Sequence, residues 1–116
     1  MTNIKDPSEY IDSGIAKFEA KDYKGAISDF TKAIELNQKD PKAYFMRGNA
    51  KLFLENYAGA IANYNKAIEL NPKDVDTYIK RGYAKRMLGD KLGEASDYAE
   101  GALVNCEIAS ERRKTN

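Results

Sequence analysis

Residues 41–74 read PKAYFMRGNAKLFLENYAGAIANYNKAIELNPKD, and related segments of the same length precede and follow them. Residues 7–40 share 17 of the 34 positions without a gap, and residues 75–108 share 9. Identical residues recur at Tyr10, Tyr44 and Tyr78, and again at Gly14, Gly48 and Gly82. A repeat of this period predicts a stack of similar units, each of which contacts only its neighbours.

Each unit has the features of two helices joined by a short turn. Asp6–Pro7 and Asp40–Pro41 place a capping Asp before Pro, which is typical of a helix start. Capping residues for the second helix recur at Asp22, Asn56 and Asp90. We therefore predict helices at 7–20, 23–36, 41–54, 57–70, 75–88 and 91–105, and no strand.

The ends of the second helices are predicted with alternatives. A left-handed residue often closes a helix, and the residues in this place are Asn37, Asn71 and Asn105. Pro72 prevents continuation of the middle unit, whereas Cys106 takes its place in the third. The last helix either continues through Ile108 and Ala109 toward Arg112, or a separate short helix covers 107–113.

The pattern resembles the tetratricopeptide repeat. In the middle unit, the matching residues are Tyr44, Gly48, Tyr57, Ala60, Tyr64, Ala67 and Pro72. The resemblance implies an all-α fold, a right-handed α-solenoid of three helix-turn-helix repeats with a short C-terminal extension. We expect a lead at 1–6, repeats at 7–40, 41–74 and 75–108, and a tail or helix extension at 109–116. The third repeat diverges in its second helix, which is typical of a capping repeat.

One position departs from the family in every repeat. The usual aromatic residue is replaced by Lys17, Lys51 and Lys85. A Lys stem can cover apolar surface while its amine reaches a carboxylate, and Asp29 and Asp97 are the expected partners. Asn63 interrupts this series in the middle repeat.

The composition of the chain argues against a catalytic, cofactor or metal site. The chain has 19 Lys and Arg, 18 Asp and Glu, no His and one Cys among 116 residues. The net charge of +1 provides no overall attraction to nucleic acid or to a membrane surface. Without His or a phosphate-binding loop, the sequence predicts no enzyme, cofactor or metal site. The single Cys106 and the lack of a visible signal sequence fit a cytoplasmic location.

In the family, the first helices of the repeats line a concave groove. The corresponding residues predicted to contact a partner are Ile11, Ile15, Phe45, Met46, Asn49, Phe53, Ile79, Lys80, Tyr83 and Arg86. We expect a groove that is acidic at the first repeat, apolar in the middle and basic at the third. Neighbouring repeats could instead bury the apolar members, and the basic cluster could be a solvated face.

These features favour a non-catalytic scaffold that binds a peptide or helix segment of a protein partner with an acidic end. Some family members hold chaperone tails through a carboxylate clamp, and the matching positions are Ile11, Ile15, Met46, Asp76 and Lys80. Only Lys80 is cationic, so we predict no tight binding of such tails. The alternative is a structural module that forms homo-oligomers through the last repeat at Val104 or Ile108, or a piece of a longer scaffold.

Overall fold

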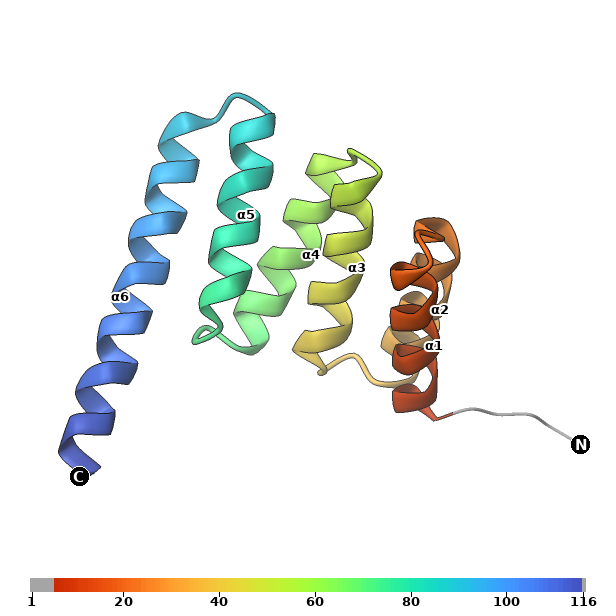
Figure 1. The fold of residues 1–116 in the computed structure, drawn as a ribbon, viewed down its shortest axis with the longest axis horizontal. Helices are drawn as coiled ribbons and strands as arrows, with labels where there is room; N and C mark the ends of the chain where they lie inside the picture. Colours follow the sequence, from red (N-terminus) through yellow and green to blue (C-terminus); the bar gives the residue numbers. More distant parts are fainter. Residues whose placement is uncertain (1–5, 116) are drawn as a thin grey trace, which may run out of the picture.

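The computed structural model describes residues 6–115, which form helices and turns without any strand. The helices are α1 (Pro7–Glu19), α2 (Tyr23–Leu36), α3 (Pro41–Phe53), α4 (Tyr57–Leu70), α5 (Val75–Met87) and α6 (Lys91–Thr115) (Figure 1). The predicted all-α solenoid of three helical hairpins is confirmed. Except for Asp6, the predicted lead at 1–6 lies outside the described residues, as does Asn116 at the end of the predicted tail.

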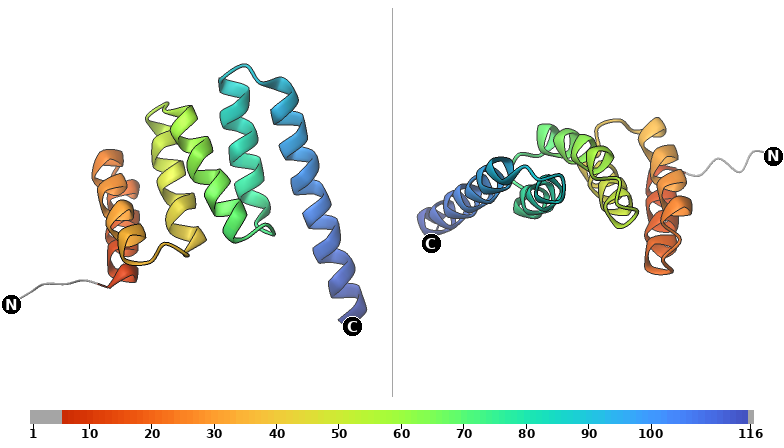
Figure 2. Two further views of the ribbon diagram at one scale, coloured as in Figure 1. Left: turned by 180° about the vertical axis from the view of Figure 1, so that it is seen from behind. Right: turned by 90° about the horizontal axis from the view of Figure 1, so that it is seen from above.

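The hairpins stack in chain order, and each second helix packs on the first helix of the next repeat (Figures 1 and 2). The first helices α1, α3 and α5 also contact one another in turn. Among the described residues, no such contact joins α2 to α4 or α4 to α6. The stack therefore curves so that the first helices share its inner side, where they can line a common surface.

One residue in each hairpin turn both closes the first helix and starts the second. The Asp22 amide donates to the Lys17 carbonyl at 2.8 Å, while its carboxylate accepts from the Gly25 amide at 3.0 Å. Lys21 precedes it in the left-handed region with φ 65°, as do Glu55 and Gly89 in the other repeats. This arrangement lets two antiparallel helices follow each other with almost no loop.

The prediction of left-handed Asn residues between repeats is wrong. Asn37 and Asn71 are extended, with φ of −146° and −144°. Their side-chain oxygens accept from the amides of Lys39 and Lys73, so each Asn shapes the turn toward the next helix. Asn105 lies inside α6 and is helical.

The predicted end of the last helix at residue 105 is also wrong. Of the two alternatives, continuation through Ile108 and Ala109 toward Arg112 is correct, and a separate helix at 107–113 is not formed. Cys106 replaces a helix breaker, and Ile108 stands where Asp40 and Asp74 cap the other repeats. With neither stop signal present, α6 continues to Thr115 as one helix. The Lys73 ammonium lies 3.5 Å from the Glu111 carboxylate and joins this extension to the turn before α5.

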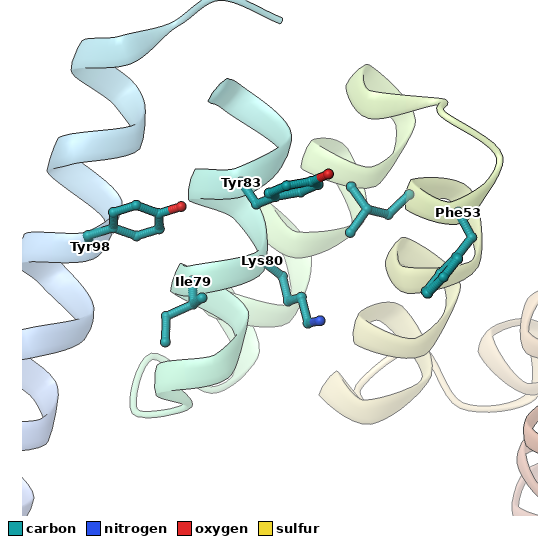
Figure 3. A pocket seen from close by; sticks show the side chains of 6 residues that line it. Phe53, Ile79, Lys80, Tyr83 and Tyr98 are labelled. Carbon is teal, nitrogen blue, oxygen red and sulfur yellow. The ribbon is translucent and has the colours of Figure 1, made fainter. Parts of the chain in front are cut away.

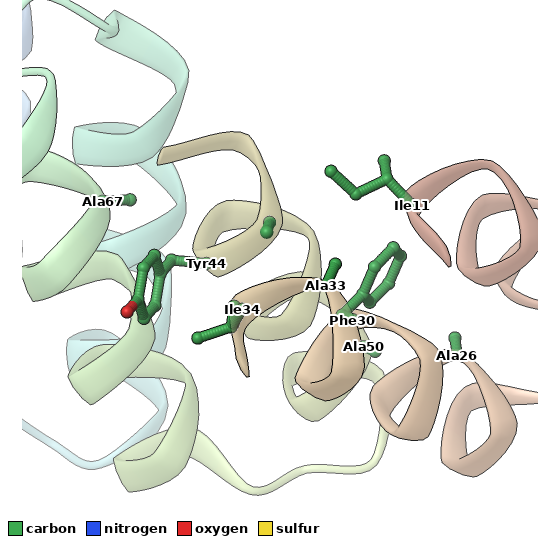
Figure 4. Close-up of a cluster of buried hydrophobic side chains, with 9 residues drawn as sticks. Ile11, Ala26, Phe30, Ala33, Ile34, Tyr44, Ala50 and Ala67 are labelled. Atoms are coloured by element: carbon green, nitrogen blue, oxygen red, sulfur yellow. The ribbon is translucent and has the colours of Figure 1, made fainter. Parts of the chain in front are cut away.

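Figure 4 shows the buried cluster shared by the first two repeats, in which the Phe30 ring lies among small side chains. In each repeat, one aromatic ring of this kind lies on a helical glycine. A Cβ atom on Gly14 would lie 2.5 Å from the Phe30 ring, and one on Gly48 would lie 2.7 Å from the Tyr64 ring. The next repeat covers both rings completely, whereas the corresponding Tyr98 of the last repeat is 39% exposed. Repeat position therefore decides whether the same residue type is core or surface.

Buried carboxylates link the two helices of the outer repeats. The Lys17 ammonium lies 3.0 Å from Asp29, and the Lys85 ammonium lies 3.2 Å from Asp97, as predicted. Arg81 adds two hydrogen bonds to Asp97, at 2.6 and 3.0 Å. In the middle repeat, the buried Asn63 carbonyl and the Arg47 Nε have no hydrogen-bond partner among the described residues.

Candidate peptide-binding groove

A hollow of about 370 Å³ lies between the second and third repeats, on the side of the first helices. It is lined by Leu52, Phe53, Ile79, Lys80, Tyr83 and Tyr98 (Figure 3). Phe53 is 57% exposed, and Ile79 and Tyr83 are 45% and 41% exposed. We call these six residues the groove hollow. Large apolar side chains gathered in one exposed hollow are typical of a binding surface rather than of scattered surface residues.

An aromatic cluster holds the Phe53 side of the groove hollow. The Phe53 ring stacks on Tyr23 with ring centres 5.0 Å apart, and Phe18 meets it edge-on at 5.3 Å. These contacts cross from the first repeat to the second, so they restrict the ring that the last residue of α3 presents. A restricted aromatic side chain loses little conformational entropy when a ligand covers it.

The basic cluster on α5 divides into buried and outward-facing parts. Arg81 and Lys85 pair with Asp97, which is 1% exposed, so their charges stabilise the hairpin. Lys80 extends along the groove hollow and forms no ion pair with any described residue (Figure 3). Its ammonium is therefore the charge available to a ligand that occupies the hollow.

The structure brings together four of the predicted contact residues, which are Phe53, Ile79, Lys80 and Tyr83. Three others, Ile15, Phe45 and Met46, are half-buried and pack against the core between the first two repeats. Arg86 is exposed outside the hollow, with its Nε 3.9 Å from Glu94.

Two predicted contact residues are engaged within the fold. Ile11 is only 6% exposed and belongs to the core cluster, so its predicted place on the groove surface is wrong. The Asn49 carbonyl oxygen accepts a 2.6 Å hydrogen bond from the Tyr64 hydroxyl. Burial of this hydroxyl raises the pKa of Tyr64 well above its ordinary value, because the phenolate would be desolvated.

Two lining residues were absent from the predicted set, namely Leu52 and Tyr98. Leu52 directly precedes Phe53, and the alignment of the repeats gives it as a groove-lining position, although it was left out of the set of predicted contact residues. Tyr98 repeats the core positions of Phe30 and Tyr64, so its sequence pattern indicates burial. Its place in the last described repeat was the available signal for exposure.

The groove hollow provides apolar contact and one positive charge. The described residues contain no group of three or more His, Cys, Asp or Glu side chains placed to hold a metal ion. Within residues 6–115, no helix combines the length and apolarity needed to span a membrane.

Comparisons with known sequences agree with this architecture. Two family models described as "Tetratricopeptide repeat" match residues 10–40 and 30–62, and one described as "TPR repeat" matches residues 54–89. A search of curated proteins found no match.

Solved structures share the same fold. MamA superposes with a TM-score of 0.88 at 23% identity, over 90% of this chain but only 61% of the MamA chain. The first TPR of Spaghetti (RPAP3), bound to the HSP90 peptide SRMEEVD, gives a TM-score of 0.83 at 25% identity. That match covers 93% of this chain and 88% of the other. The TPR2B domain of yeast Sti1, in a complex with pHsp70, gives 0.86 at 25% identity, over 90% and 83% of the two chains.

The family matches together span residues 10–89, and the superpositions cover the stacked helical hairpins. This chain therefore belongs to the tetratricopeptide repeat family.

Proposed function

We propose that this protein is a non-catalytic interaction module that binds a peptide or helix segment of a partner protein in the groove hollow. The observation that carries this proposal is the group of exposed apolar side chains around Lys80, which forms no ion pair with the residues that the structure describes. Peptide complexes of the similar Spaghetti and Sti1 domains support it at the level of the family.

The chemistry of the hollow defines the ligand. A volume of about 370 Å³ accommodates one or two large apolar side chains. In Figure 3 the Tyr98 and Phe53 rings lie at the two ends of the lining, and the Tyr83 ring lies between them. Lys80 then favours an Asp or Glu near the apolar anchor, because an exposed ammonium attracts a nearby carboxylate. The proposed ligand is an apolar anchor followed or preceded by an acidic residue.

Acidic chaperone tails are a separate question, because a carboxylate clamp requires several cations on the first helices. Of the five matching positions, Ile11 is buried, Ile15 and Met46 are apolar and half-buried, and Asp76 is acidic. Lys80 alone can contact a carboxylate. We propose that the peptide SRMEEVD binds only weakly, and a nanomolar Kd in a titration would contradict this part of the proposal.

The test is a selection of random peptides displayed on phage against the immobilised chain, followed by titration of the enriched peptides. Enriched peptides should contain a large apolar residue with Asp or Glu close to it. Tyr83→Ala should weaken their binding by about tenfold or more, as expected for a central aromatic contact. Lys80→Glu should weaken binding most at low salt, because screening reduces its contribution in wild type at high salt.

Leu36→Ala is the matched control, because Leu36 is 50% exposed and lies outside the groove hollow. It should leave the affinity unchanged. Enriched peptides that bind Tyr83→Ala and Lys80→Glu as tightly as wild type would overturn the assignment of this site.

A further inference from the structure

The three repeats differ in the charge that they place between the two helices of each hairpin. In the third repeat, Arg81 and Lys85 converge on the buried carboxylate of Asp97, at 2.6 to 3.2 Å. In the first repeat, the single cation Lys17 lies 3.0 Å from Asp29. Each cation at these positions of the outer repeats therefore has a carboxylate within the same hairpin.

The middle repeat keeps both cations and lacks the carboxylate. Arg47 and Lys51 take the places of the two cations of the third repeat, whereas the uncharged Asn63 takes the place of the carboxylate. Neither Arg47 nor Lys51 forms an ion pair with any residue in the part of the chain that the structure describes. Within residues 6–115, two positive charges therefore lie at this position without a counter-charge.

Both cations are partly withdrawn from water. Arg47 and Lys51 are half-buried, and desolvation lowers the pKa of both. The Arg47 charge lowers the pKa of Lys51 further, which indicates that the two cations lie close together. Charges interact more strongly in a half-buried site than in bulk water, so an anion that enters this site is attracted by both cations.

Unused hydrogen-bonding groups lie at the same place. Asn63 is 4% exposed, and its buried carbonyl oxygen has no hydrogen-bond partner among the described residues. The Arg47 Nε is likewise buried and unpaired within residues 6–115, while Arg47 Nη1 donates to Thr31 on α2 at 3.2 Å. A turn of the Asn63 amide exchanges its oxygen for N–H donors, from which an anion can accept. Buried polar groups normally have partners, so the unused ones indicate that a component of the solvent completes the site.

We propose that the middle repeat binds a dissolved monovalent anion, of about the size of chloride, between Arg47 and Lys51 and beside Asn63. The anion supplies the negative charge that Asp97 supplies in the third repeat. None of the three residues lines the groove hollow, so the anion acts on the stability of the hairpin and the site does not depend on the proposed peptide binding.

The chloride dependence of stability tests this site. Urea unfolding of the full chain is measured at pH 7 from about 5 to 200 mM sodium chloride. With a Kd of about 10 mM, the folding equilibrium constant of wild type should rise about tenfold over this range. Asn63→Asp provides the negative charge from the chain itself, so its stability should stay constant or fall as salt screens the ion pair.

Two variants separate this site from general effects of salt. Gln38→Glu is the matched control, because it adds the same charge at an exposed position and should respond to chloride as wild type does. Arg47→Ser removes one cation and introduces the residue type that Ser13 provides at this place in the first repeat, so the hairpin tolerates it. Its stability should no longer rise with chloride.

NMR of the chloride nucleus measures binding directly, because exchange with a protein site broadens the resonance of free chloride. Wild type and Gln38→Glu should broaden this resonance, whereas Asn63→Asp and Arg47→Ser should not, with helical circular dichroism showing that each variant is folded. Equal broadening by wild type and Arg47→Ser, or an equal chloride dependence of stability in all four proteins, would overturn the proposal. A wild type that shows no response to chloride would also overturn it, since water alone would then complete the site.

Discussion

The middle repeat lacks the buried carboxylate that the other two repeats share, and Asn63→Asp should supply it. Arg47 and Lys51 occupy the places that Arg81 and Lys85 occupy around Asp97 in the third repeat. Both are half-buried, and desolvation lowers the pKa of both cations. The Arg47 Nε and the Asn63 carbonyl oxygen are buried without a hydrogen-bond partner among the described residues. A carboxylate at position 63 can reproduce the arrangement of Asp97 with Arg81 and Lys85.

The expected gain follows from that arrangement. Asp97 accepts two hydrogen bonds from Arg81, at 2.6 and 3.0 Å, and lies 3.2 Å from the Lys85 ammonium. Hydrogen bonds to charged groups contribute about 1.5–3 kcal/mol each, but burying the new carboxylate costs several kcal/mol. We expect a net increase of about 1–2 kcal/mol in the free energy of unfolding, or roughly 3–8 °C in Tm.

The pH dependence identifies the cause. Arg47 and Lys51 should hold the pKa of the carboxyl introduced by Asn63→Asp below the unfolded value of about 4. The gain is therefore complete above that value and is lost as the pH falls through the lower folded pKa. Urea unfolding at pH 7 and pH 3 measures this difference.

Gln38→Glu is the control, because it adds one negative charge at an exposed position and should leave stability almost unchanged. An Asn63→Asp protein that is no more stable than wild type at pH 7, or that keeps its advantage in acid, would refute the proposed ion pairing.

Two further predictions concern the packing of the hairpins. Gly48→Ala should destabilise the protein by about 1–3 kcal/mol in urea, because its Cβ would lie 2.7 Å from the Tyr64 ring. Gly101→Ala should stabilise by about 0.5–1 kcal/mol, since its nearest neighbour is at 3.5 Å and Ala favours helix; destabilisation by both changes would contradict the steric explanation. Tyr64→Phe should cost about 1 kcal/mol at pH 7, because the bond to Asn49 is lost. Burial raises the folded pKa of Tyr64, so wild type loses stability above pH of about 10 while the Phe protein lacks this loss. The difference in the free energy of unfolding between wild type and Tyr64→Phe should therefore become smaller in urea titrations above pH of about 10. A difference that stays constant with pH would contradict this explanation.

The alignment of the repeats predicted only part of the groove correctly. The alignment of the repeats placed Phe53, Ile79, Lys80 and Tyr83 on the groove side of the first helices, and the structure brings these four residues together. The same alignment also placed Ile11 on the groove side, but Ile11 is buried because a core is shared between the first two repeats. A periodic sequence specifies which residues are equivalent, but it does not specify which equivalents a neighbour covers.

Equivalent residues differ in burial at both ends of the described stack. Ala50 and Ala84 are completely buried under the second helix of the preceding repeat, whereas Ala16 is exposed because no described helix precedes α1. Tyr98 is exposed because no described hairpin follows α6, although its equivalents are core residues. The groove hollow gains Tyr98, and the uncovered side of α6 exists, for this reason.

The sequence by itself determined the number of repeats, the start of every helix and the pairing of Lys17 and Lys85 with buried carboxylates. These features depend on contacts within a hairpin, and caps, turn residues and residue spacing encode such contacts locally. Tertiary structure alone decided the composition of the groove hollow and the exposure of Tyr98. Those depend on which surfaces neighbouring hairpins cover, because burial is a property of the assembled stack and not of any single repeat.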